Sequence, residues 1–507
     1  MRKSDKYKAW LLASIMSVIC LIAGIVVYIP INWGDDYAQY ISQAKAIVDG
    51  SVDEFISDNG FIINNSSNLL GAITYPWGLP CILAFMMGIG YDSVFAFHMM
   101  EVMCIVGAGL ILFWIGIDIT GKISGGGTTS ALVLLNIVFV KYSAVIATDI
   151  CFPLFIMSGM AISYILFYKD NRYNYPSFQR NILLILLGVH IFMATAVRDG
   201  GIVLLIAVVL QQIINWIKNN DIAKLSCQVS EITLLQLAYW IPRITFERVF
   251  PLFQESHYDM METAGFQRLI QNMIGYIKCF WEIYPFHKMI STALLVITMC
   301  MVIVGVIATS KDLFLLPLLY AIGTFGLYCI WPVFIGIRFG FSAFMALLIY
   351  VPFGIKYIRT KHADSKKLSA SCLAVAVSVV TILGGTELAY IVKYSIIPPQ
   401  INSGPYTHDA EELFEFIYSS TQENEIIVFQ KPRALYLNTG HLGMQVDSKD
   451  FNEKLPMADY VVDGIEEDLG DYNEETLKQY DSENDSIDLV SVFENDMFKM
   501  YKIEKRK

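Results

Sequence analysis

The sequence has little charge for its length. Only 16% of its 507 residues are Asp, Glu, Lys or Arg, while 55% are hydrophobic, and the mean hydropathy is +0.50. Soluble globular domains carry about 25% charged residues. One water-soluble core is too small to hide so much apolar surface, so the composition argues against a soluble protein and indicates a lipid bilayer as its surroundings.

The chain also lacks a basic region. Residues 394–507 carry 10 Lys and Arg against 24 Asp and Glu, whereas residues 1–393 carry 26 against 23. Nucleic-acid binding requires a basic footprint, so we expect no nucleic-acid partner. The change in composition near residue 394 predicts two domains, a transmembrane domain over 1–393 and a soluble domain over 394–507.

Cysteine is absent from residues 394–507 and is not arranged for metal binding elsewhere. All nine cysteines precede that tail, and none forms a CxxC pair or a Cys/His ligand spacing. The pattern predicts neither a zinc site nor a disulfide framework.

Long apolar segments are abundant. A hydrocarbon core of about 30 Å needs roughly 20 apolar residues per helix. The first segment lacks a small-residue cleavage site and is interpreted as a retained span, not a signal peptide. The sequence therefore predicts about eleven transmembrane helices, at 9–30, 93–118, 128–147, 150–168, 181–198, 200–217, 229–246, 287–309, 313–330, 339–355 and 368–393.

The segment from Tyr75 to Tyr91 is the ambiguous one, because it is short and contains two prolines and several glycines. If it is not a span, one alternating set of loops holds 16 of the 26 Lys and Arg residues that precede the tail, including the cluster between 356 and 367. The positive-inside rule then places these loops and the amino terminus in the cytoplasm. The tail is expected on the extracytoplasmic side. The glycine run 125–127 is interpreted as a flexible cytoplasmic turn.

The tail has the pattern of a small α/β domain. Residues 408–418 have the apolar spacing of an amphipathic helix, and 425–429 and 458–462 that of short strands. Residues 489–493 and 497–503 are predicted to form a closing hairpin. The expected fold is thus an all-helical membrane domain with interfacial helices in its first outer loop, followed by an extracytoplasmic α/β domain.

Charged residues gather at the outer ends of the predicted spans. Ionisable groups at such positions are costly unless they pair with one another or line a wet cavity, so a collection on one face indicates a polar site there. The residues are Asp35, Asp36, Asp149, Arg198, Asp199 and Arg338.

Asp35 and Asp36 begin an amphipathic stretch that ends near Gly50. It is expected to lie along the membrane surface, with its carboxylates at the end of the helix that favours negative charge. The alternative is that the aspartates only cap this helix.

Several short motifs occur in a definite order along the membrane part. Together they resemble the GT-C-type membrane glycosyltransferases, which include the protein O-mannosyltransferases and the lipid A aminoarabinose transferase. The motifs are Gly34-Asp35-Asp36-Tyr37, Tyr75-Pro76-Trp77-Gly78-Leu79-Pro80, Thr148-Asp149, Ala196-Val197-Arg198-Asp199-Gly200 and Ile337-Arg338-Phe339-Gly340.

The resemblance implies transfer of a sugar, with inversion, from a polyprenyl-phosphate-linked donor to a glycan, lipid or protein acceptor of the cell envelope. By position, Asp35 corresponds to the residue expected to bind or deprotonate the acceptor hydroxyl. Asp36 stands where relatives often have Glu, a departure that shortens its reach and leaves its role open. Arg338 and Arg198 are the candidates for holding the donor phosphate.

Tyr37, Tyr75 and Asp149 are the candidate substrate-binding residues. The alternatives are structural: Arg198 pairs with its neighbour Asp199 or anchors a helix end at the headgroups, Asp149 caps a helix, and Tyr75 belongs to an aromatic anchor at the interface.

Two functions compete with sugar transfer, namely a transporter or flippase of lipid-linked intermediates and a catalytically silent membrane scaffold. The sequence contains no inverted repeat of the kind that transporters use. Whether a divalent cation takes part is open, because two adjacent carboxylates without further ligands are weak evidence for a cation site.

Overall fold

The computed structural model spans the whole chain. It describes residues 3–28, 33–68, 70–169, 176–219, 225–253, 266–310, 313–331, 334–361, 366–399, 401, 403–464, 469, 474–483 and 487–505.

The chain divides into two compact units. Unit 1 consists of Met1–Tyr28, Ala96–Phe250 and Met260–Pro398, and unit 2 of Ile29–Phe95, Pro251–Asp259 and Pro399–Lys507. Unit 2 thus joins the acidic tail to the segment between α1 and α5. The division into domains 1–393 and 394–507 stays a prediction about where the membrane part ends.

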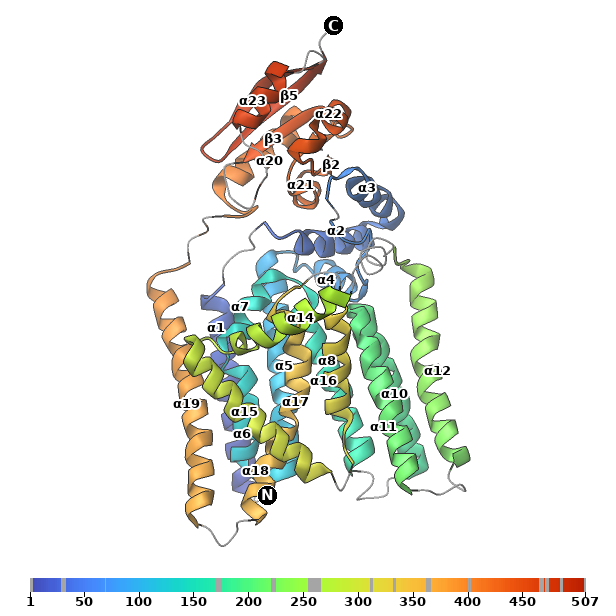
Figure 1. The fold of residues 1–507 in the computed structure, drawn as a ribbon, viewed down its shortest axis with the longest axis vertical. Coiled ribbons are helices and arrows are strands. Elements are labelled where there is room, and N and C mark those ends of the chain that lie inside the picture. Colours follow the sequence, from blue (N-terminus) through green and yellow to red (C-terminus); the bar gives the residue numbers. More distant parts are fainter. Residues whose placement is uncertain are drawn as a thin grey trace. The chain divides into compact units, whose positions relative to one another are not determined.

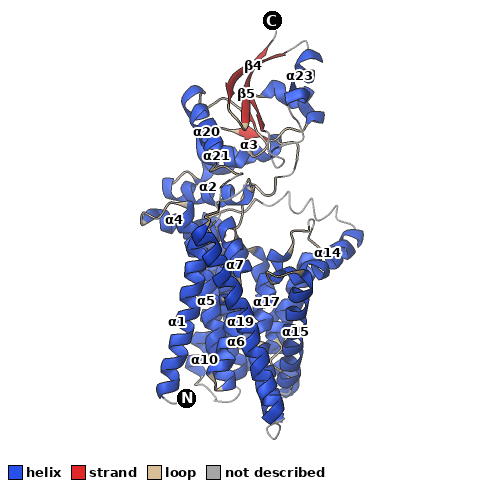
Figure 2. Cartoon of the chain, turned by 90° about the vertical axis from the view of Figure 1, so that its left-hand side faces the viewer, coloured by secondary structure: helices blue, strands red, loops and turns tan. Residues whose placement is uncertain are grey.

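The regular elements in the described residues of unit 1 are all helices, joined by turns and loops (Figures 1 and 2). Its elements are α1 (Lys3–Val26), α5 (Val94–Thr120), α6 (Ile123–Leu134), α7 (Ile137–Tyr142), η1 (Ser143–Val145), α8 (Thr148–Ser163), the π-helical η2 (Tyr164–Lys169), α10 (Ser177–Val197), η3 (Asp199–Gly201), α11 (Ile202–Asn219), α12 (Leu225–Val249), α14 (Phe266–Cys279), η5 (Phe280–Ile283), α15 (Lys288–Thr309), α16 (Leu316–Cys329), η6 (Ile337–Gly340), α17 (Phe341–Leu348), α18 (Tyr350–Lys361) and α19 (Lys366–Ile396).

Nine helices within the described residues are long and apolar enough to cross a membrane. They correspond to nine of the eleven predicted spans. The other two differ for distinct reasons, since α12 has 25 residues but is more polar, and α16 is apolar but has only 14 residues. The segment from Tyr75 to Tyr91 contains α4 (Gly78–Gly88), whose 11 residues give a length of about 16 Å, too short to span.

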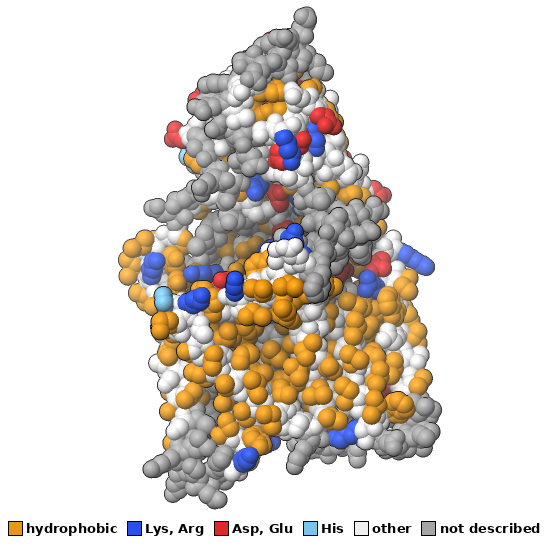
Figure 3. All heavy atoms as spheres, in the orientation of Figure 1, with side chains coloured by type: hydrophobic (Ala, Val, Ile, Leu, Met, Phe, Trp, Pro, Cys, Tyr) orange, Lys and Arg blue, Asp and Glu red, His pale blue; other side chains and the backbone are white. Residues whose placement is uncertain are grey.

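The helix α1 shows how these helices pack. Small residues at helical spacing, including Ala9, Ala13 and Ala23, are buried, while Leu11 and Ile15 on another face are exposed. Small side chains let neighbouring backbones approach, which is how membrane helices gain contact area without a hydrophobic driving force. Figure 3 shows apolar side chains covering the visible face of the helices of unit 1.

The prediction of a flexible turn at residues 125–127 is wrong. These glycines lie buried inside α6. A Cβ on Gly116 of α5 would lie 2.8 Å from the Cα of Gly126, so the missing side chains permit close packing of α5 on α6. The glycine run therefore serves packing, and the helix continues through it.

Unit 2 combines three helices of the segment between α1 and α5 with the α/β tail. The elements are α2 (Asp35–Asp49), α3 (Val52–Asn65), α4, α20 (His408–Ser420), β1 (Ile427–Val428), α21 (Pro432–Thr439), β2 (Gly443–Met444), η7 (Ser448–Asp450), α22 (Phe451–Lys454), η8 (Leu455–Met457), β3 (Tyr460–Gly464), α23 (Glu474–Glu483), β4 (Ile487–Glu494) and β5 (Phe498–Lys505).

The tail contains one mixed sheet with the strand order β2-β1-β3-β5-β4. Strand β1 pairs in parallel with β2 and β3, and β5 pairs antiparallel with β3 and β4. The predicted helix at 408–418 and the closing hairpin are confirmed as α20 and β4–β5. The sequence did not predict β2 or α21.

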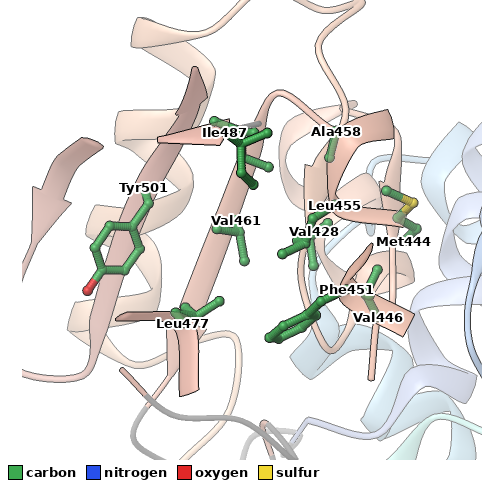
Figure 4. Packing of buried hydrophobic residues seen from close by; sticks show 11 residues of the cluster. Val428, Met444, Val446, Phe451, Leu455, Ala458, Val461, Leu477, Ile487 and Tyr501 are labelled. Carbon is green, nitrogen blue, oxygen red and sulfur yellow. The ribbon is translucent and has the colours of Figure 1, made fainter. Parts of the chain in front are cut away.

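A cluster of buried apolar side chains holds the sheet to its helices (Figure 4). Val428 of β1, Val461 of β3 and Ile487 of β4 contribute from the sheet, and Phe451 of α22 and Leu477 of α23 pack against them. Each side chain is at most 2% exposed, and full burial of a Val, Leu, Ile or Phe is worth about 1.5–3 kcal/mol. The tail is therefore held by packing without disulfides.

Candidate functional site

The helix α2 begins at Asp35, directly after Gly34 in an extended conformation (φ −66°, ψ 129°), and ends at Gly50 in the left-handed region (φ 72°). Gly34 occupies the N-cap position, with no side-chain hydrogen bond to the helix. The capping interpretation therefore does not describe Asp35, which lies within the first turn. The positive end of the helix dipole favours its carboxylate there.

Asp35 is partly buried, and its Oδ1 atom is inaccessible and has no hydrogen-bond partner among the described residues. The pKa of Asp35 is raised to about 6, mainly by burial and to a smaller extent by the negative charge of Asp36, and the charges of Arg433 and Lys431 keep it from rising further. A carboxylate with such a pKa is still mostly ionised at neutral pH and is a stronger base than an ordinary aspartate.

Tyr37 lies on the same helix turn and is 1% exposed. Its hydroxyl is also buried without a partner in the part of the chain that the structure describes. Burial raises the pKa of Tyr37, as do the charges of Tyr406 and Asp35, so the hydroxyl is a proton donor. Buried polar atoms without partners are uncommon in folded proteins. Two of them on one turn indicate a place for a polar ligand.

Asp36 accepts a hydrogen bond from a tyrosine far along the chain. The Tyr75 hydroxyl donates to Asp36 Oδ1 at 2.9 Å, and Arg433 Nη1 donates to the Tyr75 hydroxyl oxygen at 3.3 Å. Arg433 Nη2 also donates to the carbonyl oxygen of Ala72 at 3.1 Å, and the guanidinium lies 5.5 Å from the centre of the Tyr75 ring. Tyr75 therefore orients Asp36, and Arg433 orients Tyr75.

Amide side chains of α2 fix the segment that carries Tyr75. Gln39 Nε2 donates to the carbonyl oxygens of Ala72 and Ile73, each at 3.1 Å. Gln43 binds both backbone groups of Tyr75, at 3.0 Å through its Nε2 and at 3.1 Å through its Oε1. Both glutamines are buried. Since hydrogen-bonded buried amides restrain a backbone strongly, the position of Tyr75 is set by α2.

A second polar cluster lies in unit 1. Asp149, in the first turn of α8, is 3% exposed. Arg198 Nη2, at the end of α10, lies 2.6 Å from Asp149 Oδ1, and Arg338 Nη1, in η6, lies 3.3 Å from Asp149 Oδ2. The guanidinium of Arg198 lies 4.4 Å from the centre of the Phe339 ring. Two guanidinium groups share one carboxylate, and guanidinium groups are the side chains best suited to bind an anion such as a phosphate.

An apolar cavity of about 270 Å³ adjoins this cluster along the chain, because Ile337 and Gly340, on either side of Arg338, line it. Aromatic residues from α14 and α16, among them Tyr276 and Phe325, form other walls. Its lining is almost wholly apolar, as a hydrocarbon chain would require.

The structure brings the predicted residues together in two groups. Asp35, Asp36, Tyr37 and Tyr75 lie in unit 2, and Asp149, Arg198 and Arg338 in unit 1. The alternative of Asp149 as a simple cap does not account for its two arginine partners.

Two residues of the sites were not predicted from the sequence. Arg433 is 2% exposed and lies beside the acidic pair. In the sequence it lies in a segment, 426–436, that has the pattern of a strand and a turn, and nothing there indicates the partners of the arginine. Glu101 of α5 is fully buried and interacts electrostatically with Asp149 and Arg198. Its signal in the sequence is a carboxylate inside the predicted span 93–118, since ionisable residues within spans commonly mark polar sites.

No group of three or more His, Cys, Asp or Glu side chains that could hold a metal ion occurs in the described ranges. Asp35 and Asp36 are the acidic pair to which the sequence analysis would assign a divalent cation.

Part of the chain is similar to a known protein family. The family model described as dolichyl-phosphate-mannose-protein mannosyltransferase matches residues 83–262. A search of curated proteins finds no match.

Solved structures are similar over most of the chain. The apo oligosaccharyltransferase from Archaeoglobus fulgidus has a TM-score of 0.60 at 10% identity, covering 91% of this chain and 70% of that one. The same enzyme, AglB, bound to an inhibitory peptide and dolichol-phosphate has a TM-score of 0.56 at 11% identity, covering 92% and 70%. ArnT from Cupriavidus metallidurans bound to undecaprenyl phosphate has a TM-score of 0.54 at 10% identity, covering 97% of each chain.

These similarities confirm the resemblance that the sequence motifs predicted. The chain has the GT-C-type fold of membrane glycosyltransferases, with many apolar helices and a small mixed sheet near its carboxyl end. It is a multi-pass membrane protein.

Proposed function

We propose that this GT-C-type protein is a glycosyltransferase that moves a sugar from a polyprenyl-phosphate-linked donor to an acceptor on the extracytoplasmic face of the cell membrane. The family match and the lipid phosphates named in the similar structures support this donor class. The amino terminus is cytoplasmic and the tail extracytoplasmic, as the distribution of Lys and Arg favours.

Asp35 is the general base. The observation that carries this assignment is its buried Oδ1, which accepts no hydrogen bond from any described group, at the start of a well-anchored helix. A pKa of about 6 keeps the Asp35 carboxylate ionised at neutral pH and ready to take the proton of an acceptor hydroxyl,. The hydroxyl of Tyr37, which is also buried without a described partner, donates a hydrogen bond to the substrate.

The reaction is a direct displacement at the anomeric carbon. The acceptor oxygen forms a new bond to that carbon, its proton goes to Asp35, and the bond to the lipid phosphate oxygen breaks with its electron pair leaving on the phosphate. Attack opposite the leaving group inverts the anomeric configuration.

Arg338 and Arg198 hold the donor phosphate and stabilise the charge that develops on it as the sugar leaves. Asp149 keeps the two guanidinium groups in place, at 2.6 Å and 3.3 Å. The apolar cavity next to Arg338 accepts part of the isoprenoid chain. Cations and an apolar wall are the two features that a lipid phosphate requires.

The test is sugar transfer by the purified protein in lipid, with a panel of radiolabelled polyprenyl-phosphate sugars. Wild type should consume one donor, and Asp35→Asn should lose at least about 100-fold in rate, since general-base catalysis contributes about 10²–10⁴-fold. Asp49→Asn is the matched control because Asp49 is exposed at the opposite end of α2.

Arg338→Ala should lose about 100-fold or more in rate, as removal of one charge-stabilising donor does elsewhere. Arg243→Ala is its control, since Arg243 is bonded to Glu247 within α12. If the protein binds a donor or carries it across the bilayer without transferring its sugar, the protein is a transporter and the proposed transferase function is wrong. If Asp35→Asn transfers the sugar at the rate of wild type, Asp35 is not the general base.

A further inference from the structure

The tail reaches the acidic pair at two points, both within unit 2. The first is Trp33, two residues before Asp35 and 1% exposed. Its ring lies edge-on to three aromatic rings of the tail, with centroids 6.3 Å from Phe414, 5.6 Å from Phe429 and 6.0 Å from Phe498. Aromatic rings in this edge-to-face arrangement attract one another in addition to burying apolar area. The residues leading into α2 are therefore seated in the core of the tail.

The second point is Arg433, in the first turn of α21. It is bonded to the Tyr75 hydroxyl and to the carbonyl oxygen of Ala72, and Tyr75 in turn donates to Asp36. Arg433 is also the cation with the largest effect on the charge of Asp35. One buried guanidinium thus fixes the partner of Asp36 and supplies positive potential to Asp35.

Further bonds hold α21 to the segment between α1 and α5 without touching the acidic pair. The Tyr436 hydroxyl donates to Asp58 Oδ2 at 2.9 Å, and Lys45 Nζ donates to the carbonyl oxygen of Leu437 at 3.2 Å. These bonds fix the position of α21. Arg433 is the residue of this helix that is connected to the acidic pair, through the Tyr75 hydroxyl.

We propose that the α/β tail is a positioning module for the acidic pair of α2, with Arg433 as the positioning residue that orients Tyr75 and, through it, Asp36. This rests on the proposed role of Asp35 as the base. According to this proposal the tail takes part in catalysis. If the tail were only a separate binding module, changes in it would not alter the pH at which Asp35 becomes active.

The groups whose charges act on Asp35 define the expected pH behaviour. They are Asp36, which raises its pKa, and Lys431 and Arg433, which lower it. The neighbouring hydroxyls of Tyr37 and Tyr75 are neutral at working pH because burial raises the pKa of both groups. A nearby positive charge favours the ionised form of a carboxyl group and so lowers its pKa. Removal of Arg433 should therefore raise the pKa of Asp35.

The first experiment is the pH profile of transfer rate in the full-length protein. Arg433→Met should move the acid limb to higher pH, and Arg433→Lys should return it toward wild type because the charge is kept. Tyr436→Phe is the matched control, since it removes a docking bond of the same helix without removing a cation, and its acid limb should coincide with that of wild type. Lys431→Met, a half-buried position, should give a smaller upward shift and serves if Arg433→Met does not fold.

The second experiment needs no activity. Thermal unfolding midpoints are measured between pH 4 and 9 for wild type, Asp35→Asn, Arg433→Met and the double variant. The pH at which the difference caused by Asp35→Asn levels off reports the pKa of Asp35 in each background. It should lie at a higher pH in the Arg433→Met background.

The outcomes separate the two proposals. Loss of transfer in Asp35→Asn together with an unchanged acid limb in Arg433→Met would overturn the role of Arg433 and leave the base in place. Full transfer in Asp35→Asn would overturn the base, and the unfolding series would then decide alone: equal levelling-off points in both backgrounds overturn the positioning role, and a shift supports it.

Discussion

Asp35→Asn should make the protein more stable while it abolishes transfer. The folded protein holds the Asp35 carboxyl at a pKa of about 6, whereas the ordinary value is 3.8. Below pH 3.8 the group is protonated in both states and has no effect. Between the two values the folded state binds a proton that the unfolded state has released, so stability falls as the pH rises. Above about pH 6 the full penalty of holding the charge is present.

The size of that penalty follows from the difference between the two pKa values. At 1.36 kcal/mol per pH unit, the difference of about two corresponds to about 3 kcal/mol. Asp35 is only partly buried as a residue, and solvent reduces such effects. A buried Asn amide without partners also carries a desolvation penalty of its own, though smaller than that of a charge. The expected net gain for Asp35→Asn at pH 7.5 is therefore about 1–3 kcal/mol.

The assay is tryptophan fluorescence during heating, in one detergent, at a series of pH values; the chain contains eight tryptophans. Asp35→Asn should unfold at a higher temperature than wild type at pH 7.5, and the two should converge toward pH 4. Asp49→Asn should follow wild type at every pH. A variant that is no more stable at pH 7.5, or whose gain is the same at pH 4 and 7.5, would refute the assigned environment of Asp35.

Three further predictions concern the same sites and the packing of unit 1. Transfer by wild type should decline as the pH falls through about 6, because Asp35 must be ionised to accept a proton,; a rate that is flat down to pH 5 would contradict this. Tyr75→Phe removes the 2.9 Å hydrogen bond to Asp36 and should lower the transfer rate about tenfold, since bonds to charged groups are worth about 1.5–3 kcal/mol; initial rates at saturating donor check it. Gly305→Ala in α15 would place a Cβ against the carbonyl oxygen of Tyr350 in α18 and should destabilise the protein by about 1–3 kcal/mol, seen as a lower unfolding temperature than Gly326→Ala, whose Cβ meets nothing within 4 Å.

The local sequence pattern predicted an element correctly where the structure of that element depends on its own residues. The span helices follow from runs of apolar residues, because a helix satisfies its own backbone groups in lipid. The helix α2 follows from acidic residues in its first turn and Gly50 at its end, and the hairpin of β4 and β5 follows from two β-rich runs with a short turn between them.

Prediction from the local sequence failed where the structure of a segment depends on the element that packs against it or pairs with it. The glycines at 125–127 look like a turn but lie inside α6, because α5 packs there too closely for side chains. Strand β2 has only two residues, so its pairing with β1 left no periodicity to detect.

The sequence alone determined the membrane class, the GT-C resemblance and the identity of the candidate acids and arginines, since these depend on composition and on motifs in a fixed order. Only the tertiary structure decided their partners. Asp149 meets Arg198 and Arg338 through three separate helices, and Arg433 meets Tyr75 across 358 residues of chain. Contacts at such separations depend on how helices and sheet pack, and no local pattern encodes them.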